Sequence, residues 1–445
     1  MRKPLLVFSG PVGTRSGYGD HARDLVHSLI KMDKYDIKIL SQKWGDCPMN
    51  ALSMENSMDR ELISRMMFGP MDFQPEIWIQ LTVPNEFQRV GKFNIGITAG
   101  IETTICSSAW IEGLNRMDLI IVPSEHAKAV FTNTTYEKLN EQKQKVGDLK
   151  LEKPIEVLFE GLDTSIFFKT ENLITSVRRK LNNIVKEDFC FLFVGHWLKG
   201  NVGEDRKNTG LLVKLFMEVF KDRPNPPALL LKTSSATFSE IDREQLSMKI
   251  QRIKESIVHT TSVPSVYVVH GDLTPNELNE LYNHSKIKAH ITLTKGEGFG
   301  RPLLEASVSE KPIIASGWSG HLDFLHKDYT ILLDGELKNV DASAVWENVI
   351  IPESKWFNVN TNNAGSMMLT VWQNYKNIKP RAISQANYVR ENFTLMQMHN
   401  KFVEMVEKYI PVIPIKLDLN RPKPKITLPK LKKVSLPKLN KKSGD

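Results

Sequence analysis

Cysteine is scarce in this chain of 445 residues, in which Cys47, Cys106 and Cys190 stand far apart. No Cys-x-x-Cys pair occurs, so the sequence argues against both a disulfide framework and a cysteine-ligated zinc site. Long apolar runs are also missing, since a membrane-spanning helix needs about 20 such residues. The apolar run near the N-terminus is too short for a signal peptide and reads as a first strand. These absences are typical of a reducing compartment, and we expect a cytoplasmic protein.

A surplus of positive charge is missing from most of the chain. The formal net charge is +8, but residues 419–445 alone carry nine basic residues and one acidic residue, so residues 1–418 are neutral. A globular nucleic-acid binder would place its basic charge on the fold itself, which argues against that class. The tail is rich in proline and lysine, so we expect it to be disordered. Three functions stay open for the tail: a solubilising end, a contact with an anionic membrane surface and a contact with nucleic acid.

Strand-like and helix-like segments alternate along the chain in two successive runs. The first run begins with the strand Leu5–Ser9, a glycine-rich loop and an amphipathic helix over about Asp20–Met32; the second begins with the strand Phe189–Val194. Two runs of β-α-β units predict two parallel sheets that bind ligands at the carboxyl ends of their strands. We therefore predict an α/β fold of two Rossmann-like domains facing across a cleft, with C-terminal helices and a disordered basic tail.

The predicted domain boundaries follow from these runs. Residues 1–165 form an N-terminal acceptor-side domain, and residues 166–380 form a C-terminal domain that binds a nucleotide sugar. Residues 381–412 read as helices that pack back on the N-terminal domain, and residues 413–445 form the tail. Within the first domain, the polar and lysine-rich residues 133–153 predict a helix extension followed by a mobile loop.

The strongest functional signal is the motif Lys295–Ala306, in which three alternate glycines follow a buried strand and Pro302 opens a helix. Glycines let backbone amides approach an anion closely, and the amides at a helix N-terminus suit a diphosphate. Glu305 is expected in the first turn of this helix, where its carboxylate accepts hydrogen bonds from the vicinal hydroxyls of a ribose. Glu297 lies eight residues earlier and faces the sugar. The motif therefore predicts a site for a sugar nucleotide.

The spacing of Glu297 and Glu305 resembles the Glu-x7-Glu donor motif of a large family of retaining glycosyltransferases with the GT-B fold of two Rossmann domains. This is the family 4-like group, also called glycosyl transferases group 1. Further segments fall in the order that the family has, and the resemblance covers about residues 5–330. These segments are Ile121–Ala127, Glu160–Asp163, Phe193–Gly195, Arg206–Asn208, Leu230–Lys232 and His270–Leu273.

The resemblance implies a role for each residue of the site. Glu305 would bind the ribose, Glu297 would face the donor sugar, and Lys207 with Arg206 would neutralise the departing diphosphate. Such electrostatic stabilisation needs no metal, and the sequence has no Asp-x-Asp pair of the kind that binds a metal diphosphate. No cofactor is implied, because the donor, a UDP-, GDP- or ADP-linked sugar, is a substrate. Further donor contacts are expected from Gly298, Phe299, Gly300, Leu304, Lys232 and Leu273, and from Gly17 and Gly19 of the first loop.

Two positions depart from the family's pattern. The family often has an arginine after the Val-Gly that ends the first strand of the C-terminal domain, whereas His196 and Trp197 follow here. Arg206 or Lys199 must then supply the second positive charge. Many relatives carry a sugar-contacting histidine where this chain has Glu102 or its neighbours, and Glu102 is the candidate for a related place.

The segment Gly17–Ala22 also matches Gly-x-Gly-x-x-Ala, a dinucleotide-binding fingerprint. Two facts argue against that interpretation: the glycines begin well beyond the first strand, and the second strand ends at Lys43 without an acid for a ribose. A flexible turn is the plainer alternative. We prefer a loop that faces the cleft near the donor phosphates or the acceptor.

The sequence thus predicts a glycosyltransferase, of hexosyltransferase type, that moves a sugar from a nucleotide sugar to a hydroxyl acceptor. The acceptor stays open between a polysaccharide, a lipid, a protein and a modified nucleic acid. An epimerase or phosphorylase on the same fold is a second hypothesis, and a non-catalytic nucleotide-sugar-binding module is a third. The plain alternatives also stay open: Glu297 and Glu305 as solvated charges, and Lys207 as a surface residue at a helix start.

Overall fold

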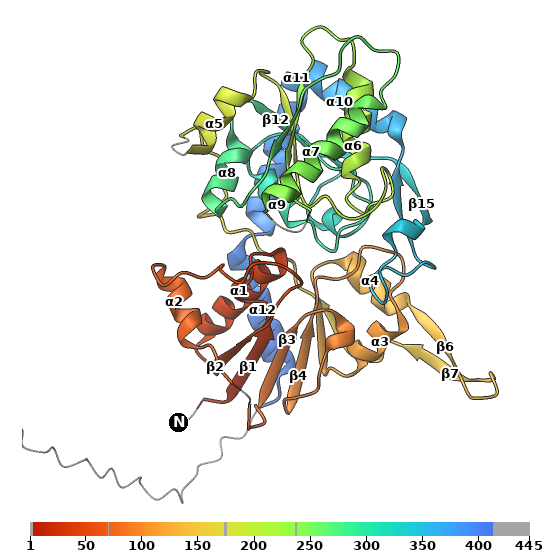
Figure 1. Ribbon diagram of the computed structural model, residues 1–445. Coiled ribbons are helices and arrows are strands. Elements are labelled where there is room, and N and C mark those ends of the chain that lie inside the picture. Colours follow the sequence, from red (N-terminus) through yellow and green to blue (C-terminus); the bar gives the residue numbers. More distant parts are fainter. Residues whose placement is uncertain (1–2, 70, 173–175, 236–237, 413–445) are drawn as a thin grey trace, which may run out of the picture.

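The computed structural model describes residues 3–69, 71–172, 176–235 and 238–412. Figure 1 shows two lobes stacked one above the other, each built around one sheet with helices packed against it. The N-terminal lobe contains strands β1 to β8, and the C-terminal lobe contains strands β9 to β16. The predicted α/β class and the two-domain arrangement are therefore confirmed.

The sheet of the N-terminal lobe has six parallel strands in the order β2-β1-β3-β4-β5-β8. Its strands are β1 (Leu5–Gly10), β2 (Asp36–Ser41), β3 (Ile77–Leu81), β4 (Phe93–Ile97), β5 (Leu119–Val122) and β8 (Ile155–Val157). The helices of this lobe are α1 (Gly17–Met32), α2 (Ser57–Ser64), the short η1 (Pro84–Glu86), α3 (Ser108–Asn115) and α4 (Glu125–Asn133).

The sheet of the C-terminal lobe also has six parallel strands, in the order β11-β10-β9-β12-β13-β14. Its strands are β9 (Cys190–Val194), β10 (Ala228–Lys232), β11 (Val266–Val269), β12 (Ile287–Ile291), β13 (Ile313–Ser316) and β14 (Ile331–Leu333). Its helices are α5 (Ser176–Ile184), α6 (Thr209–Phe220), α7 (Glu240–Glu255), α8 (Pro275–Asn283), α9 (Arg301–Ser307), η2 (Gly320–Asp323), η3 (Ala342–Ala344) and α10 (Thr361–Gln373).

The strand orders identify where each sheet can bind a ligand. In a doubly wound sheet, ligands bind beyond the carboxyl ends of the two strands between which the chain reverses direction. That point lies between β9 and β12 in the C-terminal lobe and between β1 and β3 in the N-terminal lobe. The loops that leave β9 and β12 contain Arg206, Lys207 and the glycine motif, so the topology brings these segments to one edge.

Apolar side chains of the strands and of the helices that cover them pack together on the faces of both sheets. In α1 the predicted apolar face of Ala22, Leu25, Val26 and Leu29 is fully buried against the N-terminal sheet. In the C-terminal lobe, Phe191 and Phe193 of β9 pack with Phe216 of α6 on one side of the sheet. Continuous burial of neighbouring strand residues is typical of parallel sheets, whose two faces are both covered by helices.

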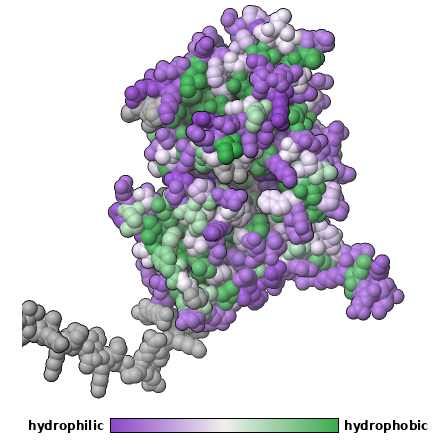
Figure 2. Space-filling model, in the orientation of Figure 1, coloured by the Kyte–Doolittle hydropathy of each residue, from purple (hydrophilic) through white to green (hydrophobic). Residues whose placement is uncertain are grey.

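The prediction for residues 133–153 is wrong. In place of a helix extension and a mobile loop, the chain forms an antiparallel hairpin of β6 (Thr135–Leu139) and β7 (Lys145–Lys150). Tyr136 explains this, because its hydroxyl donates a hydrogen bond of 2.5 Å to the carbonyl of Cys106 and ties the first strand to the lobe. The hairpin projects from the flank of the N-terminal lobe and is largely hydrophilic (Figure 2).

A second hairpin, β15 (Gly335–Asn339) with β16 (Lys355–Val359), follows the C-terminal sheet. Two long helices then end the described chain. Helix α11 (Tyr375–Asn392) packs against α9 of the C-terminal lobe, and α12 (Leu395–Tyr409) packs against α1 of the N-terminal lobe. Sequence alone predicted both helices, although α11 begins before Arg381. The predicted disordered tail, residues 413–445, lies outside the described residues.

The chain crosses between the lobes twice at one place. Leu162, on the way out of the N-terminal lobe, accepts a hydrogen bond from the amide of Leu395 and donates one to the carbonyl of Phe393, each 2.8 Å. Gly161 fits there because a Cβ on it would lie 2.6 Å from the Cα of Leu395. Within the described residues, no helix is both long enough and apolar enough to cross a membrane.

Candidate functional site

The glycine motif forms the loop between β12 and α9. Gly300 is the N-cap of α9 with φ 103°, a left-handed conformation that favours glycine, and Pro302 lies in the first turn as predicted. Among the described residues, none accepts a hydrogen bond from the backbone amides of residues 298–300. The prediction that Glu305 lies in the first turn is wrong, because α9 begins at Arg301 and Glu305 is its fifth residue.

Lys207, Arg206 and Glu297 meet at the carboxyl ends of β9 and β12. The Lys207 Nζ lies 2.6 Å and 2.7 Å from the two carboxylate oxygens of Glu297. The Arg206 guanidinium donates a 2.9 Å hydrogen bond to the carbonyl of Gly296 and lies 3.4 Å from Glu297. Arg206 also lies 3.4 Å from Glu102 of the N-terminal lobe. Two cations and two carboxylates thus meet across the boundary between the lobes.

The charges around Glu297 decide its ionisation. Burial alone would raise the pKa of Glu297, but the nearby charges of Lys207 and Arg206 and the hydrogen bonds from Lys207 lower its pKa to about 2. Glu297 is therefore a carboxylate at neutral pH. An ionised pair of this kind keeps a lysine cation in place beside the loop whose amides are free to bind an anion.

Glu305 lies on the side of α9 that faces the N-terminal lobe. Its carboxylate accepts a 3.2 Å hydrogen bond from the Tyr282 hydroxyl of α8 and a 3.2 Å hydrogen bond from the Arg301 Nε. Burial raises the pKa of Glu305 to about 7, although Arg301 counteracts that rise. The carboxyl is therefore poised between its neutral and ionised forms near pH 7.

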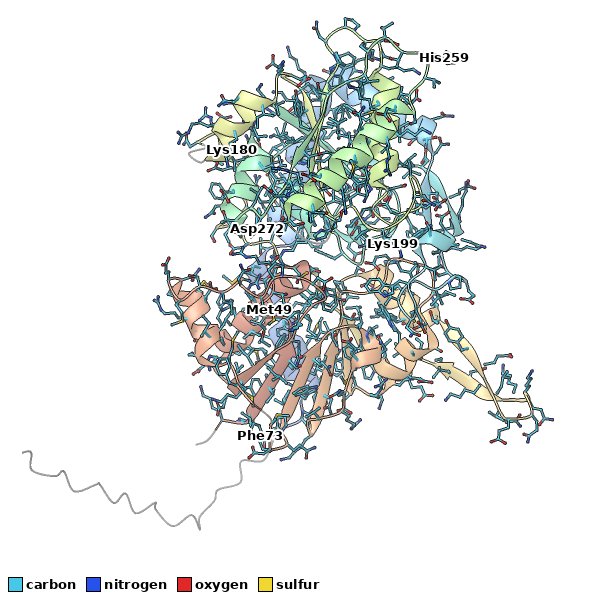
Figure 3. The ribbon with its side chains drawn as sticks, in the orientation of Figure 1. Met49, Phe73, Lys180, Lys199, His259 and Asp272 are labelled. Atoms are coloured by element: carbon cyan, nitrogen blue, oxygen red, sulfur yellow. The ribbon has the colours of Figure 1, made fainter. Side chains whose placement is uncertain are left out.

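The segment 270–273, which contains the predicted donor contact Leu273, lies next to Lys232, another predicted donor contact. The Lys232 Nζ donates a 2.7 Å hydrogen bond to the carbonyl of Gly271, where φ is 104°. Across the boundary, Arg15 of the N-terminal lobe lies 2.6 Å from the carboxylate of Asp272. Figure 3 shows Asp272 and Met49 on either side of this boundary. Leu273 is half-buried and packs against the apolar core of the C-terminal lobe.

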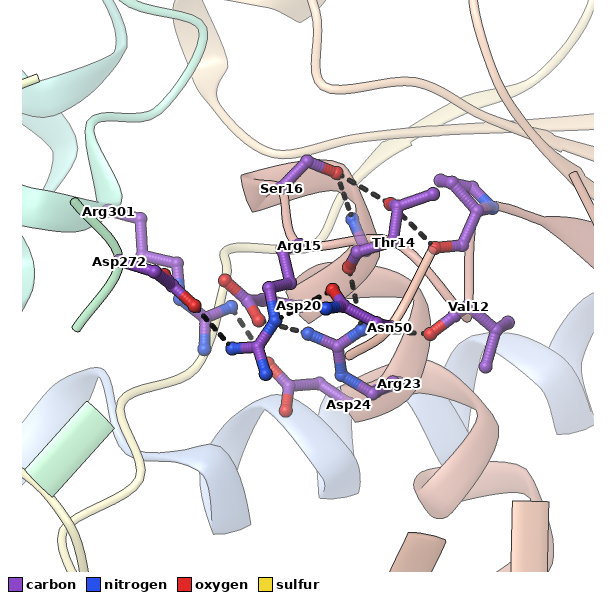
Figure 4. A network of polar contacts seen from close by, with 12 residues as sticks. Val12, Thr14, Arg15, Ser16, Asp20, Arg23, Asp24, Asn50, Asp272 and Arg301 are labelled. Carbon is purple, nitrogen blue, oxygen red and sulfur yellow. Dashed lines mark hydrogen bonds and ion pairs between the residues drawn. The ribbon is translucent and has the colours of Figure 1, made fainter. Parts of the chain in front are cut away.

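Gly17 and Gly19 lie in the first turn of α1, because this helix begins three residues before the predicted Asp20. Ser16 caps the helix by accepting a 3.0 Å hydrogen bond from the amide of Gly19. A Cβ on Gly19 would lie 2.2 Å from the carbonyl oxygen of Thr14, whereas a Cβ on Gly17 would meet nothing within 4 Å. Close packing of the loop therefore requires a glycine at position 19, whereas position 17 has room for a side chain. Figure 4 shows this loop and its polar contacts.

Two of the predicted donor residues contribute side chains to the core. Leu304 is fully buried, and Phe299 packs against Phe324 with 5.0 Å between the ring centroids. These contacts hold the glycine loop against the C-terminal sheet. A small cavity opens beside that loop, and Lys207, Tyr282, Thr292, Glu297, Gly300 and Leu303 are among the residues that line it.

The lobes touch directly on the other side of the glycine loop. The Ser124 hydroxyl donates a 2.6 Å hydrogen bond to the carbonyl of Gly298, and the amide of Glu125 donates to Asp323 at 2.9 Å. A Cβ on Gly298 would lie 1.9 Å from the carbonyl oxygen of Ala99 in the N-terminal lobe. The absence of a side chain at Gly298 therefore lets the N-terminal lobe approach the glycine loop closely.

Sequence reasoning missed Arg301, although it stands inside the motif. It also missed the partners of Arg301, which come from the N-terminal lobe and lie far away in the sequence. The two acids Asp20 and Asp24, one helical turn apart on α1, are a signal that was available. Their pairing with a residue of another domain is a property of the assembled fold.

No model of a known protein family matches the sequence, and neither does any curated protein. Solved structures match the fold. A sucrose-phosphate synthase from Thermosynechococcus elongatus matches with a TM-score of 0.59 and 12% identity, over 92% of this chain and 99% of that chain. A glycosyltransferase from Rickettsia africae has the same TM-score and identity, over 93% and 100% of the two chains.

HepE of Anabaena, solved in complex with UDP and glucose, matches with a TM-score of 0.53 and 10% identity, over 91% of this chain and 99% of that chain. At such identities these likenesses show the fold. The chain has the two-lobed GT-B fold and is similar in structure to nucleotide-sugar-dependent glycosyltransferases of that fold.

Proposed function

We propose that this chain transfers a sugar from a nucleotide sugar to a hydroxyl acceptor, with retention of configuration and without a metal. The observation that carries the proposal is the meeting of Lys207, Glu297 and the amides of residues 298–300, which donate to no described residue, at the reversal point of the C-terminal sheet. The solved structures of the same fold include one in complex with UDP-glucose, which supports a sugar nucleotide as the ligand.

The proposed reaction uses these groups in order along the donor. The amides of residues 298–300 and the cations of Lys207 and Arg206 bind the diphosphate and stabilise the negative charge that develops as it leaves. Glu305 accepts hydrogen bonds from the ribose hydroxyls, and the base lies against residues 271–273. Glu297, which is ionised, faces the donor sugar and keeps Lys207 beside the phosphates.

The acceptor is proposed to bind from the N-terminal lobe, near residues 13–19 and Glu102. Contact between the lobes then excludes water, which would otherwise hydrolyse the donor. Glu102 offers a carboxylate to the donor sugar or the acceptor hydroxyl from a position 3.4 Å from Arg206.

A panel of UDP-, GDP- and ADP-linked sugars tests the proposal in two steps. The matching donor is expected to raise the thermal unfolding midpoint, because a ligand stabilises the state that it binds. The same donor with acceptor candidates is expected to release the nucleoside diphosphate, and Glu305→Ala is expected to lose most of both effects.

Turnover in Glu305→Ala equal to that of the wild type would contradict the proposed site. Conversion of the donor to another nucleotide sugar without an acceptor would instead indicate an epimerase. If a donor stabilised the protein but no acceptor gave turnover, the result would indicate a non-catalytic nucleotide-sugar-binding module.

A further inference from the structure

Arg301 connects the two lobes through a cluster of carboxylates. Its Nη1 lies 2.8 Å from Asp24 of α1 and 3.9 Å from Glu160, which follows β8, while its Nε lies 3.2 Å from Glu305. Asp24 and Glu160 belong to the N-terminal lobe, and Glu305 belongs to the C-terminal lobe. Figure 4 shows Arg301 pointing across the boundary toward Asp24.

The cluster is buried and rich in negative charge. The side chains of Arg301, Asp24, Glu160 and Glu305 are each less than one-fifth exposed. Asp20 lies on the same helix one turn before Asp24 and pairs with Arg23. Four carboxyl groups therefore lie around two guanidinium groups. The strength of the pair between Glu305 and Arg301 thus depends on how many other carboxylates Arg301 contacts.

We propose that Arg301 is a positioning residue that aims Glu305 at the nucleotide and makes this aim depend on contact between the lobes. The proposal rests on the proposed function, in which Glu305 binds the ribose. With the lobes in contact, Arg301 is shared with Asp24 and Glu160, and Glu305 keeps acceptor capacity for hydroxyls. With the lobes apart, Arg301 has Glu305 as its remaining carboxylate, and the tighter pair competes with the ribose.

The groups that face Glu305 come from every element packed against it. They are Arg301 on its own helix, Tyr282 of α8, Asp20 and Asp24 of α1, and Glu160 after β8. Burial raises the pKa of both Glu305 and Glu160 to about 7, with Arg301 acting against the rise. The ionised carboxylate is a stronger acceptor for two ribose hydroxyls than the neutral carboxyl, so binding through Glu305 should weaken as pH falls through about 7.

Two substitutions move this dependence in opposite directions. Arg301→Leu removes the cation, so the pH midpoint for nucleotide binding moves up and affinity at pH 7.5 falls at least about tenfold. Asp24→Asn releases Arg301 to Glu305, so the midpoint moves down, while affinity above it falls several-fold because the tighter pair competes with the ribose. Arg301→Lys keeps the charge without the fork that reaches two carboxylates, so it restores the midpoint but not the full affinity.

The measurement is titration calorimetry with UDP, GDP and ADP between pH 5.5 and 9. The nucleotide that binds the wild type most tightly serves for the variants, and Glu305→Gln provides the baseline because the terminal phosphate itself titrates in this range. Thermal unfolding checks that each variant is folded. If Arg301→Leu does not fold, the downward shift of the pH midpoint expected for Asp24→Asn tests the proposal by itself.

The expected result is that the pH midpoint of nucleotide binding moves up in Arg301→Leu and down in Asp24→Asn. Glu305→Gln is expected to show only the pH dependence that comes from the phosphate of the nucleotide. Shifts in the same direction, or uniform losses with no shift, would overturn the role of Arg301 and leave the proposed function intact. A wild-type protein that binds none of the three nucleotides would overturn both.

Discussion

At the scale of single residues, Lys207 is the cation whose charge the proposed reaction needs most. Its Nζ lies 2.6 Å from Glu297, and its side chain is largely buried beside the glycine loop. Lys207→Met is expected to lower turnover about 10²- to 10³-fold, as does loss of one group that stabilises developing charge. The rate of nucleotide release with a saturating donor and acceptor measures this loss.

Lys214→Met is the matched control, because Lys214 is an exposed lysine further along the helix that Lys207 precedes. It should keep the wild-type rate. Equal rates for Lys207→Met and Lys214→Met would mean that Lys207 is a surface residue with no part in the chemistry.

Single residues were also where the sequence was most informative. The site at Glu297 and the glycines follows from residue type and spacing, and the role of Lys207 follows from the resemblance to the family; the structure brings Lys207 and Glu297 together. The sequence predicted no contact of Arg301 or Tyr282 with Glu305, because an arginine or a tyrosine has many ordinary roles. Their contacts with Glu305 exist only after α8 and α9 pack side by side.

At the scale of elements, the glycine loop before α9 is fitted against the N-terminal lobe. A Cβ on Gly298 would lie 1.9 Å from the Ala99 carbonyl oxygen, a contact that forces backbone to move. Gly298→Ala is therefore expected to cost about 1–3 kcal/mol of stability, as overpacking does, and to weaken nucleotide binding. The midpoint of thermal unfolding and a calorimetric titration measure the two effects.

Gly147→Ala in the β6–β7 hairpin is the control, since a Cβ there would meet nothing within 4 Å. It should unfold within about 0.5 kcal/mol of the wild type, as exposed substitutions do. If Gly298→Ala were as harmless as Gly147→Ala, the close fit of the two lobes at this loop would be refuted.

Helix α12 offers a separate test of how the N-terminal lobe is stabilised. Phe402 is fully buried between α12 and the apolar face of α1, whereas Met396 at the start of α12 is 67% exposed. Phe402→Ala should lower the free energy of unfolding by about 3–5 kcal/mol, and Met396→Ala by less than about 0.5 kcal/mol. Urea denaturation compares them, and similar midpoints would show that α12 does not stabilise the lobe.

Elements with a clear apolar period were predictable, and those without one were not. Helix α1 shows four buried apolar residues at helical spacing, so its existence followed from the sequence. The β6–β7 hairpin has mostly exposed polar residues, and its strand pairing depends on the turn at residues 140–144 and on the anchor of Tyr136. A segment of this kind has no repeating pattern of apolar residues, so its sequence does not predict its strands.

At the scale of the whole molecule, the fold follows from local patterns, but the meeting of the lobes does not. Buried strand runs separated by helices predicted two doubly wound sheets, and the structure has both. The pairs Arg15–Asp272 and Asp24–Arg301 join residues more than 250 positions apart, so their formation depends on how α1 is set against the C-terminal lobe. That geometry is a result of packing rather than of any local pattern.

The central claim is that one sugar nucleotide lies between the glycine loop and Glu305 at the mouth of the C-terminal sheet. A crystal structure of the protein with the nucleotide sugar that stabilises it most tests this directly. The account predicts the diphosphate within hydrogen-bond distance of the amides of residues 298–300 and of Lys207, with the ribose hydroxyls on Glu305. A nucleotide bound elsewhere, or one whose ribose does not touch Glu305, would contradict the account.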